Sequence, residues 1–314
     1  VPGEQSIFSG IRKLEPGALL KLKKNQLAEK MTTWWDTRKE FYSAKEKKFT
    51  MDKESGVLKL ESLLTNAIEK QMQADVPLGA FLSGGIDSSL IVALMQKQDL
   101  TRVNTFSIGF NENSYNEAIY AKAVAEHLNT QHTELYVSHA DAFKVIPELP
   151  KIYSEPFSDS SQIPTYLLSR LVGQHVKVAL SGDAGDELFC GYNRYKFTAK
   201  SWRYLSRVPL SIRKIIFQTL KNINPVLINR FGELTGRNLL GDKFLKGILL
   251  LKGENVSQIY ESLVSDWDIN DTIMLDYQTN NNQTKIKNDY FQDITMTEEM
   301  MLNDTLAYLV DDIL

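Results

Sequence analysis

Two short acidic, glycine-containing stretches hold the residues of this chain that could do chemistry. The first is SGGIDSS at residues 83–89, and the second is SGDAGDE at residues 181–187. Each follows an apolar run and precedes a helix-like run, so each is expected where a strand ends and a helix begins. Glycines let a backbone approach a ligand closely, and helix N-termini attract anions. The first stretch therefore predicts a phosphate-binding loop.

Two better-known loop motifs do not fit the first stretch. Gly79 and Gly84 have the G-x4-G spacing of a kinase-type P-loop, but Gly85 and Ile86 stand where Lys and Ser/Thr are required. A hydrolase nucleophile elbow needs glycine two residues before its serine, and Phe81 stands there relative to Ser83. The stretch is thus neither a kinase-type P-loop nor a nucleophile elbow.

Acidic residues give both stretches their chemical character. A carboxylate beside phosphates is repelled unless a divalent cation bridges them, so Asp87 predicts Mg²⁺. The alternative is that Asp87 or Ser88 only caps the helix. In the second stretch Asp183, Asp186 and Glu187 stand close together, although acids also favour the start of a solvated helix. Because strand-end loops on one sheet edge can face a common crevice, the pair predicts a nucleotide–Mg²⁺ site.

The elements that must position these loops alternate between strand and helix. Strands are predicted at residues 78–82, 103–110, 133–137 and 177–180, and helices at residues 55–73, 88–97, 116–128 and 164–173. This alternation predicts an α/β fold with a parallel sheet flanked by helices. From residue 195 onward the pattern is mainly helical, with a polar loop at residues 278–285.

The first part of the chain has a different pattern. Residues 7–35 predict two short strands joined by a turn, and Pro16-Gly17 is the turn signal. Residues 37–53 are charged and of low hydrophobicity, which is typical of a linker.

Composition bounds the class of protein and its partners. The 314 residues are 43% hydrophobic with a formal net charge of −3, which favours one main globular domain with an appendage. No run approaches the ~20 apolar residues of a membrane span, and no signal peptide is evident. The single cysteine, Cys190, fits a reducing compartment, and the four histidines show no zinc-type clustering. We expect a cytoplasmic protein that binds neither nucleic acid nor membrane.

Several segments, taken in chain order, resemble the glutamine-dependent asparagine synthetases. SGGIDSS is similar to the pyrophosphate-binding loop of the N-type ATP pyrophosphatases, the PP-loop superfamily. The synthetase domain of the family has counterparts of GAFLSGGIDSS, FSIGF, YNEAIYAKAVAEHL, SEPFSDSSQIPTYLLS and LSGDAGDELFCGY. The end of its glutaminase domain is similar to IFSGIRKLEPGALLKL and the WWD that follows.

The resemblance implies a domain organisation. Residues 49–314 would be an ATP-dependent synthetase domain with an adenine nucleotide α-hydrolase-like fold, a mainly helical C-terminal part, and a truncation at the C-terminus. Residues 1–48 would be a short β remnant of the glutaminase domain plus a linker. The family's glutaminase uses an N-terminal cysteine, whereas this chain begins with Val1, and we interpret Cys190 as a packing residue. Ammonia would then come from a glutaminase domain missing here.

The resemblance also implies a reaction and its residues. ATP would activate the side-chain carboxylate of aspartate to an acyl-adenylate with release of pyrophosphate, and ammonia would displace AMP to give asparagine. Asp183 matches an acid that can take a proton from the attacking ammonia, where many relatives have Glu. Asp87 and Asp186 would bind Mg²⁺. The implied pyrophosphate contacts are Ser83, Gly84, Gly85, Asp87, Ser88 and Ser89. The residues implied to surround the adenosine are Leu82, Ile108, Ser181 and Gly182.

Three functions stay open from the sequence. The leading hypothesis is an asparagine synthetase-type ligase, weak or inactive as this piece alone, with ATP, a small carboxylate and ammonia as partners and with a homodimer left open. A second keeps the adenylation but changes the acceptor to a sugar acid or a β-lactam precursor. A third is a nucleotide-binding scaffold without catalysis. The presence of Asp87, Asp183 and Asp186 together favours an enzyme.

Overall fold

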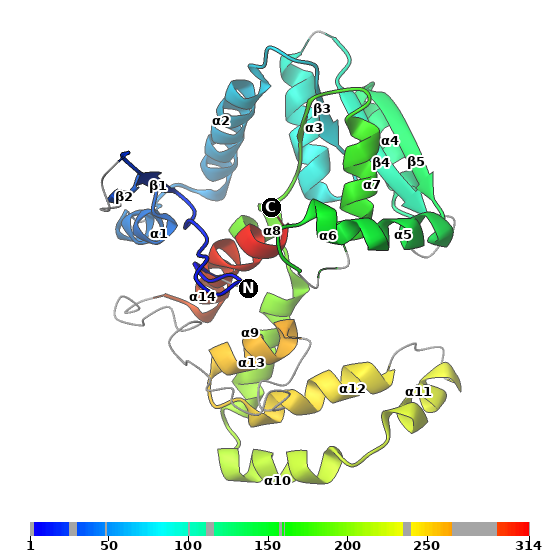
Figure 1. The fold of residues 1–314 in the computed structure, drawn as a ribbon. Helices are drawn as coiled ribbons and strands as arrows, with labels where there is room; N and C mark the ends of the chain where they lie inside the picture. The colour runs from blue at the N-terminus through cyan, green and yellow to red at the C-terminus, as the bar shows by residue number, and fades with distance from the viewer. Residues whose placement is uncertain are drawn as a thin grey trace. The chain divides into compact units, whose positions relative to one another are not determined.

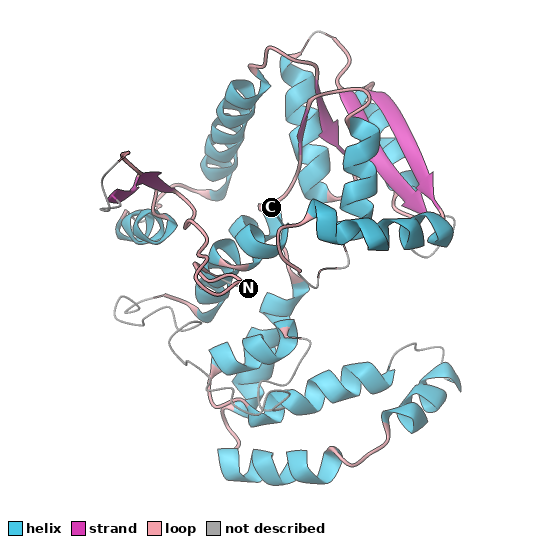
Figure 2. Ribbon diagram, in the orientation of Figure 1, coloured by secondary structure: helices cyan, strands magenta, loops and turns pink. Residues whose placement is uncertain are grey.

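The computed structural model describes residues 3–24, 30–47, 49–99, 101–110, 116–156, 159, 161–234, 240–265 and 294–313. The chain divides into two compact units. We call Val1–Asp186 with Leu306–Leu314 the sheet unit, and Glu187–Thr305 the helical unit. Figures 1 and 2 show the elements of each unit.

A four-stranded parallel sheet organises the sheet unit. Its strands are β3 (Leu78–Phe81), β4 (Asn104–Phe110), β5 (Gln131–Val137) and β6 (Val178–Leu180). They lie in the order β5-β4-β3-β6, and every neighbouring pair is parallel. The predicted α/β fold with a parallel sheet is therefore confirmed, with all four strands close to their predicted positions.

Helices cover both faces of this sheet (Figure 1). On one face, α3 (Ile86–Gln98) and α4 (Ala118–Leu128) pack on the alternate strand residues, and α2 (Lys53–Met72) adds Ile68. This core is built from Ala80, Leu82, Val92, Met95, Ala121 and Ala125. On the other face, α5 (His139–Val145) and α7 (Gln162–Val172) contribute Val145, Leu167 and Val172, which lie in the apolar clusters of Phe106 and Val137. Because successive side chains of a strand point to opposite faces, the strands contribute to an apolar core on each face of the sheet.

A histidine lies in a polar ladder between β4 and β5. The Nδ1 atom of His132 is 2.9 Å from Thr105 Oγ1, and its Nε2 atom is 3.1 Å from Ser107 Oγ. Thr105 Oγ1 also lies 2.8 Å from Thr130 Oγ1. Burial lowers the pKa of His132, because the charged imidazolium loses its solvation there. His132 is therefore a hydrogen-bonded core residue.

Three short helical turns between β5 and α7 were not predicted. They are α5, the 3-10 turn η2 (Ile146–Glu148) and α6 (Leu149–Ile152). The sequence does contain their start signal, because Ser138 and Asp141 form a reciprocal capping box at the N-terminus of α5. Hydrogen bonds from Ser138 and then Lys144 lower the pKa of Asp141 to about 2.

The N-terminal part contains the two predicted strands. These strands, β1 (Ala18–Lys21) and β2 (Lys30–Thr33), pair antiparallel. The Pro16-Gly17 turn precedes β1 instead of joining the strands, and Gly17 adopts a φ of 69°. Its carbonyl accepts hydrogen bonds from the backbone N–H groups of Trp34 and Trp35.

The linker predicted at residues 37–53 contains a helix that was not predicted. Residues Thr37–Glu46 form helix α1, and the side chain of Asp36 caps it by accepting from the N–H groups of Arg38 and Lys39. The segment is rich in residues that favour helix, and none of its side chains is buried. Low hydrophobicity was therefore no evidence against a helix.

The helical unit confirms the prediction of a mainly helical C-terminal part. It contains α9 (Asn193–Leu205), α10 (Leu210–Leu220), α11 (Pro225–Leu234), α12 (Leu240–Leu249), η3 (Leu250–Lys252), α13 (Val256–Val264) and most of α14 (Met296–Leu306). The polar loop predicted at residues 278–285 lies outside the described residues. Within the described part of the chain, no helix combines the length and the apolar character needed to cross a membrane.

One buried carboxylate links three helices of this unit. Asp304 Oδ2 accepts hydrogen bonds from Arg194 Nη2 at 2.7 Å, from the Tyr195 hydroxyl at 2.7 Å and from the Tyr260 hydroxyl. Burial and then the bond to Asp304 raise the pKa of both tyrosines. The guanidinium of Arg194 also stacks 3.8 Å above the Tyr192 ring. No pattern in the sequence predicts this network, which joins α9, α13 and α14.

Candidate functional site

The two acidic stretches leave neighbouring strands of the sheet. SGGIDSS follows β3, and the second stretch follows β6, which is hydrogen-bonded to β3. From β3 the chain builds outward through β4 and β5 and then returns to add β6 on the other side of β3. The strand order therefore reverses between β3 and β6. Ligands of open α/β sheets bind at such a switch point, beside the carboxyl ends of the strands.

Serine side chains shape the first loop from within. The hydroxyls of Ser83 and Ser88 are 2.9 Å apart, and the backbone N–H of Ser83 donates to Ser88 Oγ. The N–H of Gly85 donates to Ser83 Oγ at 3.2 Å. Ser89 Oγ is buried and meets no hydrogen-bond partner among the described residues. Because this hydroxyl lies below the accessible surface of the loop, its predicted contact with pyrophosphate stays a prediction.

The first turn of α3 follows directly from this loop. Gly85 is the N-cap residue, with a φ of −70° and a ψ of 166°, and no side chain caps the helix. Asp87 and Ser88 lie inside the helix, so the alternative that one of them merely caps it is wrong. The first N–H groups of a helix have no intrahelical acceptor, and the helix dipole adds positive potential there. This end of α3 is chemically suited to an anion.

Glycines bring the second loop against the first. A Cβ atom at Gly182 would lie 2.6 Å from the backbone nitrogen of Ser88, and one at Gly185 would lie 2.5 Å from Cγ of Asp87. Gly84, with a φ of 80°, packs equally closely on the backbone of α4 at Ala121. A Cβ atom at any of these three positions would force a neighbour to move, a backbone segment at Gly84 and Gly182 and the Asp87 side chain at Gly185. The backbone of the two loops therefore forms one continuous wall.

Two carboxylates meet at this wall. Asp186 lies in the short helix α8 (Gly185–Phe189), and Asp87 lies in the first turn of α3. Burial and then the negative charge of Asp186 raise the pKa of Asp87. A divalent cation between the carboxylates would remove that repulsion. Magnesium usually takes one or two protein carboxylates and completes its shell with phosphates and water. The pair fits that demand.

The remaining acids differ in their surroundings. Asp183 is exposed at the tip of the second loop, next to Ala184, which adopts a left-handed φ of 73°. Glu187 is buried in the helical unit and accepts a hydrogen bond from Tyr192 at 2.7 Å. Among the described residues, no three His, Cys, Asp or Glu side chains gather to hold a metal. The assignment of Mg²⁺ to Asp87 and Asp186 stays a prediction.

The predicted adenosine contacts are spread over both faces of the sheet. Leu82 is buried in the core beneath α3 and α4, and its backbone N–H donates to the Phe106 carbonyl at 2.8 Å. Ile108 packs in the apolar cluster on the α5–α7 face. Ser181 and Gly182 are half-buried at the end of β6. The assignment of these four residues to adenosine stays a prediction.

Two features of the site were missed by reasoning from sequence. The contact of Gly185 with Asp87 is one, because the composition of a loop does not say which residue meets which neighbour. The left-handed conformation of Ala184 is the other, since that conformation is uncommon for a residue with a Cβ atom. The presence of both glycine and an acid in each loop was the available signal.

Comparison with known proteins assigns the chain to a family. The family described as Asparagine synthase matches residues 59–314. This protein belongs to the asparagine synthase family. The match begins within α2 and covers both acidic loops and the helical unit.

Individual members of the family are similar over different shares of the chain. A Methanocaldococcus jannaschii protein, provisionally named asparagine synthetase (glutamine-hydrolyzing) 2, is 45% identical over 45% of this chain. A Mycobacterium tuberculosis protein with a similar provisional name is 29% identical over 85%. Asparagine synthetase (glutamine-hydrolyzing) 1 of Bacillus subtilis is 30% identical over 69%. The chain spans 27%, 40% and 33% of the length of these relatives, respectively.

A solved structure is also similar in part. It is an NH3-dependent NAD synthetase from Campylobacter jejuni, which matches 43% of this chain and 60% of its own with a TM-score of 0.32 and 16% identity. That likeness is too slight to bear on function.

Proposed function

We propose that residues 49–314 act as the ATP-dependent synthetase domain of an asparagine synthetase-type ligase. The domain adenylates the side-chain carboxylate of aspartate and transfers ammonia to it, which gives asparagine, AMP and pyrophosphate. Residues 1–48 are the closing part of a glutaminase domain and its connection. The names of the relatives, which include glutamine hydrolysis, support this arrangement.

One observation carries the proposal. The two Ser-Gly loops leave β3 and β6 at the switch point of the sheet and touch through Gly182 and Gly185. This contact puts the uncapped N-terminus of α3 beside the Asp87–Asp186 pair. An anion site next to a pair of carboxylates suits a nucleotide whose phosphates are bridged by Mg²⁺.

The residues of the first loop then have defined roles. Backbone N–H groups of residues 84 and 86–88 and the hydroxyl of Ser83 donate to the pyrophosphate of ATP, and Gly85, Ser88 and Ser89 complete the loop around it. Asp87 and Asp186 hold Mg²⁺, which supplies positive charge to the phosphates when bound. As the aspartate carboxylate attacks the α-phosphorus, negative charge grows on the departing pyrophosphate, and these donors stabilise it. Such preorganised stabilisation is often the largest single contribution to catalysis.

Asp183 serves the second half of the reaction. Ammonia must lose protons as its nitrogen bonds to the activated carbonyl carbon, and a carboxylate within reach can accept one. Asp183 is exposed at the tip of the second loop, so solvent can take the proton onward. Leu82, Ile108, Ser181 and Gly182 surround the adenosine.

The test compares two aspartates of the sheet unit. Pyrophosphate release is measured with ATP, Mg²⁺, ammonium and a panel of acceptors that includes aspartate and sugar acids. We expect Asp87→Asn to reduce release by about 10²-fold. The control Asp75→Asn, at an exposed position before β3, leaves release unchanged. Equal losses in both variants contradict the assignment of the site. Release with a sugar acid but not with aspartate retains the ligase and replaces the acceptor.

A further inference from the structure

A compact turn at the start of the chain packs against two distant segments of the sheet unit. We call residues 3–13 the N-terminal turn. The backbone N–H of Lys13 donates to the Glu4 carbonyl at 2.7 Å, which closes the turn at its base. At its tip, Ser6 Oγ donates to the Ile11 carbonyl at 3.0 Å and accepts from the Phe8 N–H at 3.1 Å. These bonds fix the shape of the turn.

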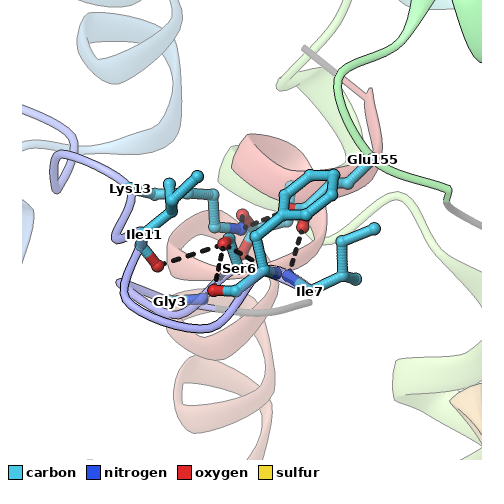
Figure 3. A network of polar contacts seen from close by, with 8 residues as sticks. Gly3, Ser6, Ile7, Ile11, Lys13 and Glu155 are labelled. Carbon is cyan, nitrogen blue, oxygen red and sulfur yellow. Dashed lines mark hydrogen bonds and ion pairs between the residues drawn. The ribbon is translucent and has the colours of Figure 1, made fainter.

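Lys13 is bonded to two carboxylates from different parts of the chain (Figure 3). Its Nζ atom lies 2.6 Å from Asp311 Oδ1 and 3.4 Å from Glu155 Oε1. The second oxygen of each carboxylate accepts a backbone N–H of the same turn. Gly3 donates to Asp311 Oδ2 at 3.1 Å, and Ile7 donates to Glu155 Oε2 at 3.1 Å. Both oxygens of each carboxylate are therefore in contact with the N-terminal turn.

This network differs from an ordinary surface ion pair. The side chains of Lys13, Glu155 and Asp311 are 29%, 19% and 15% exposed, respectively. An isolated pair on the surface contributes little, whereas several charges in one geometry are worth more. One cation here lies between two anions, so removing it leaves two partly buried carboxylates without their shared counter-charge. The N–H of Ile7 and then Lys13 keep the pKa of Glu155 low.

Glu155 lies at the ligand-binding edge of the sheet. It belongs to the segment between α6 and α7, and α7 runs into the start of β6. The N-terminus of α7 must then lie beside the carboxyl ends of the parallel strands, where the two acidic loops also emerge. Ile163, in the first turn of α7, accordingly packs in the same apolar cluster as Ile108 near the end of β4.

The segment that holds Asp311 also contacts the segment between α6 and α7 directly. Asp311 is part of the π-helical turn Leu309–Ile313. The hydroxyl of Tyr308, just before this turn, donates to Asp159 Oδ2 at 3.1 Å, and Asp159 lies in the segment between α6 and α7. Three segments therefore close a ring: the N-terminal turn, the α6–α7 segment and the C-terminal turn.

We propose that the N-terminal turn is a latch, in which Lys13 positions the α6–α7 segment at the ligand-binding edge for the synthetase reaction. This inference rests on the proposed function for its catalytic consequence only. Lys13 acts through Glu155 and Asp311, so it is a positioning residue. Without the contacts of Lys13, the two acidic loops keep their structure, whereas the α6–α7 segment loses its fixed position beside them.

The test uses the whole chain and a matched control. Lys13→Met removes the shared charge, and Lys13→Arg keeps it. The control Lys151→Met changes a residue of α6, just before the same segment, and breaks its exposed ion pair with Glu148. Hydrogen exchange is followed in peptides 149–156 and 306–313. We expect Lys13→Met to raise exchange several-fold in both peptides, and Lys13→Arg and Lys151→Met to match the unaltered chain.

Catalysis gives the second measurement. Lys13→Met should lower kcat for pyrophosphate release about tenfold with an unchanged Kd for ATP–Mg²⁺, and Lys13→Arg should restore it. Unchanged exchange in Lys13→Met, or equal increases in Lys151→Met, overturns the latch. Raised exchange with an unchanged kcat overturns the positioning role. If the unaltered chain releases no pyrophosphate with any acceptor, the proposed function fails, whereas the exchange result still decides the latch.

Discussion

Replacing Gly185 by alanine should impair the use of Mg²⁺ and leave the fold intact. An added Cβ would lie 2.5 Å from Cγ of Asp87 and 2.8 Å from its Oδ2. Non-bonded carbons rest about 3.5–4.0 Å apart, so the carboxyl group must retreat by about 1 Å. The obstructing atoms belong to a side chain that can rotate, and alanine suits the helical position at the start of α8. The fold should therefore absorb the change while the carboxylate is misplaced.

The expected magnitude follows from that displacement. A misplacement of about 1 Å in a reacting assembly costs on the order of 10²-fold in rate. We expect Gly185→Ala to lower pyrophosphate release by about this factor at limiting Mg²⁺, with partial recovery when Mg²⁺ is raised. Gly182→Ala should behave differently, because its Cβ would meet the backbone nitrogen of Ser88 at 2.6 Å. That variant should lose thermal stability as well as activity.

The assay titrates Mg²⁺ against pyrophosphate release and records Tm for each variant. Gly247→Ala in α12 is the control, since an added Cβ there meets nothing within 4 Å. A Gly185→Ala protein with the Mg²⁺ dependence and the Tm of the unaltered chain would refute the placement of Asp87 in the metal site. A lower Tm with unchanged Mg²⁺ dependence would refute it as well, because the contact would then be purely structural.

Two further predictions concern buried polar groups. Burial lowers the native pKa of His132 below its ordinary 6.5, so its contribution to stability is complete above that pH and is lost as the pH falls through the native value. His132→Gln should flatten the dependence of Tm on pH below about 6.5, and an unchanged slope would contradict this. Asp304→Asn should cost about 3 kcal/mol of unfolding free energy in urea, since Arg194 loses its counter-charge but keeps 24% exposure. A loss no larger than that of Asp75→Asn would show the network to be unimportant.

The sequence predicted the sheet well because its signals are local. Each strand is a short apolar run bounded by turn residues, and parallel order follows from the helices between the runs. The helix at Thr37–Glu46 was missed because it buries nothing, so its apolar pattern is absent. The short turns at Ile146–Glu148 and Leu149–Ile152 are too brief for periodicity to mark them.

The candidate site was predictable in its residue types but not in its contacts. The spacing of glycine and serine in SGGIDSS is sufficient to predict an anion-binding loop. The contact of Gly185 with Asp87 depends on how two loops turn after their strands, which no local pattern encodes. Lys13 and Asp311 are 298 residues apart in the chain, and neither stands in a motif. Such pairs are products of the fold, so they become visible only in three dimensions.

The polar ladder of β4 and β5 has a consequence for how the sheet assembles. Thr105 pairs with His132 in the observed register, and both point to the face under α4. A slip of β5 by one residue would turn His132 toward the apolar core under α7 and would leave Thr105 and Ser107 without their partner. Buried polar groups left unpaired are far costlier than a lost apolar contact. The ladder therefore specifies the register of this edge strand, because a one-residue slip leaves buried hydroxyls without partners once α4 covers them.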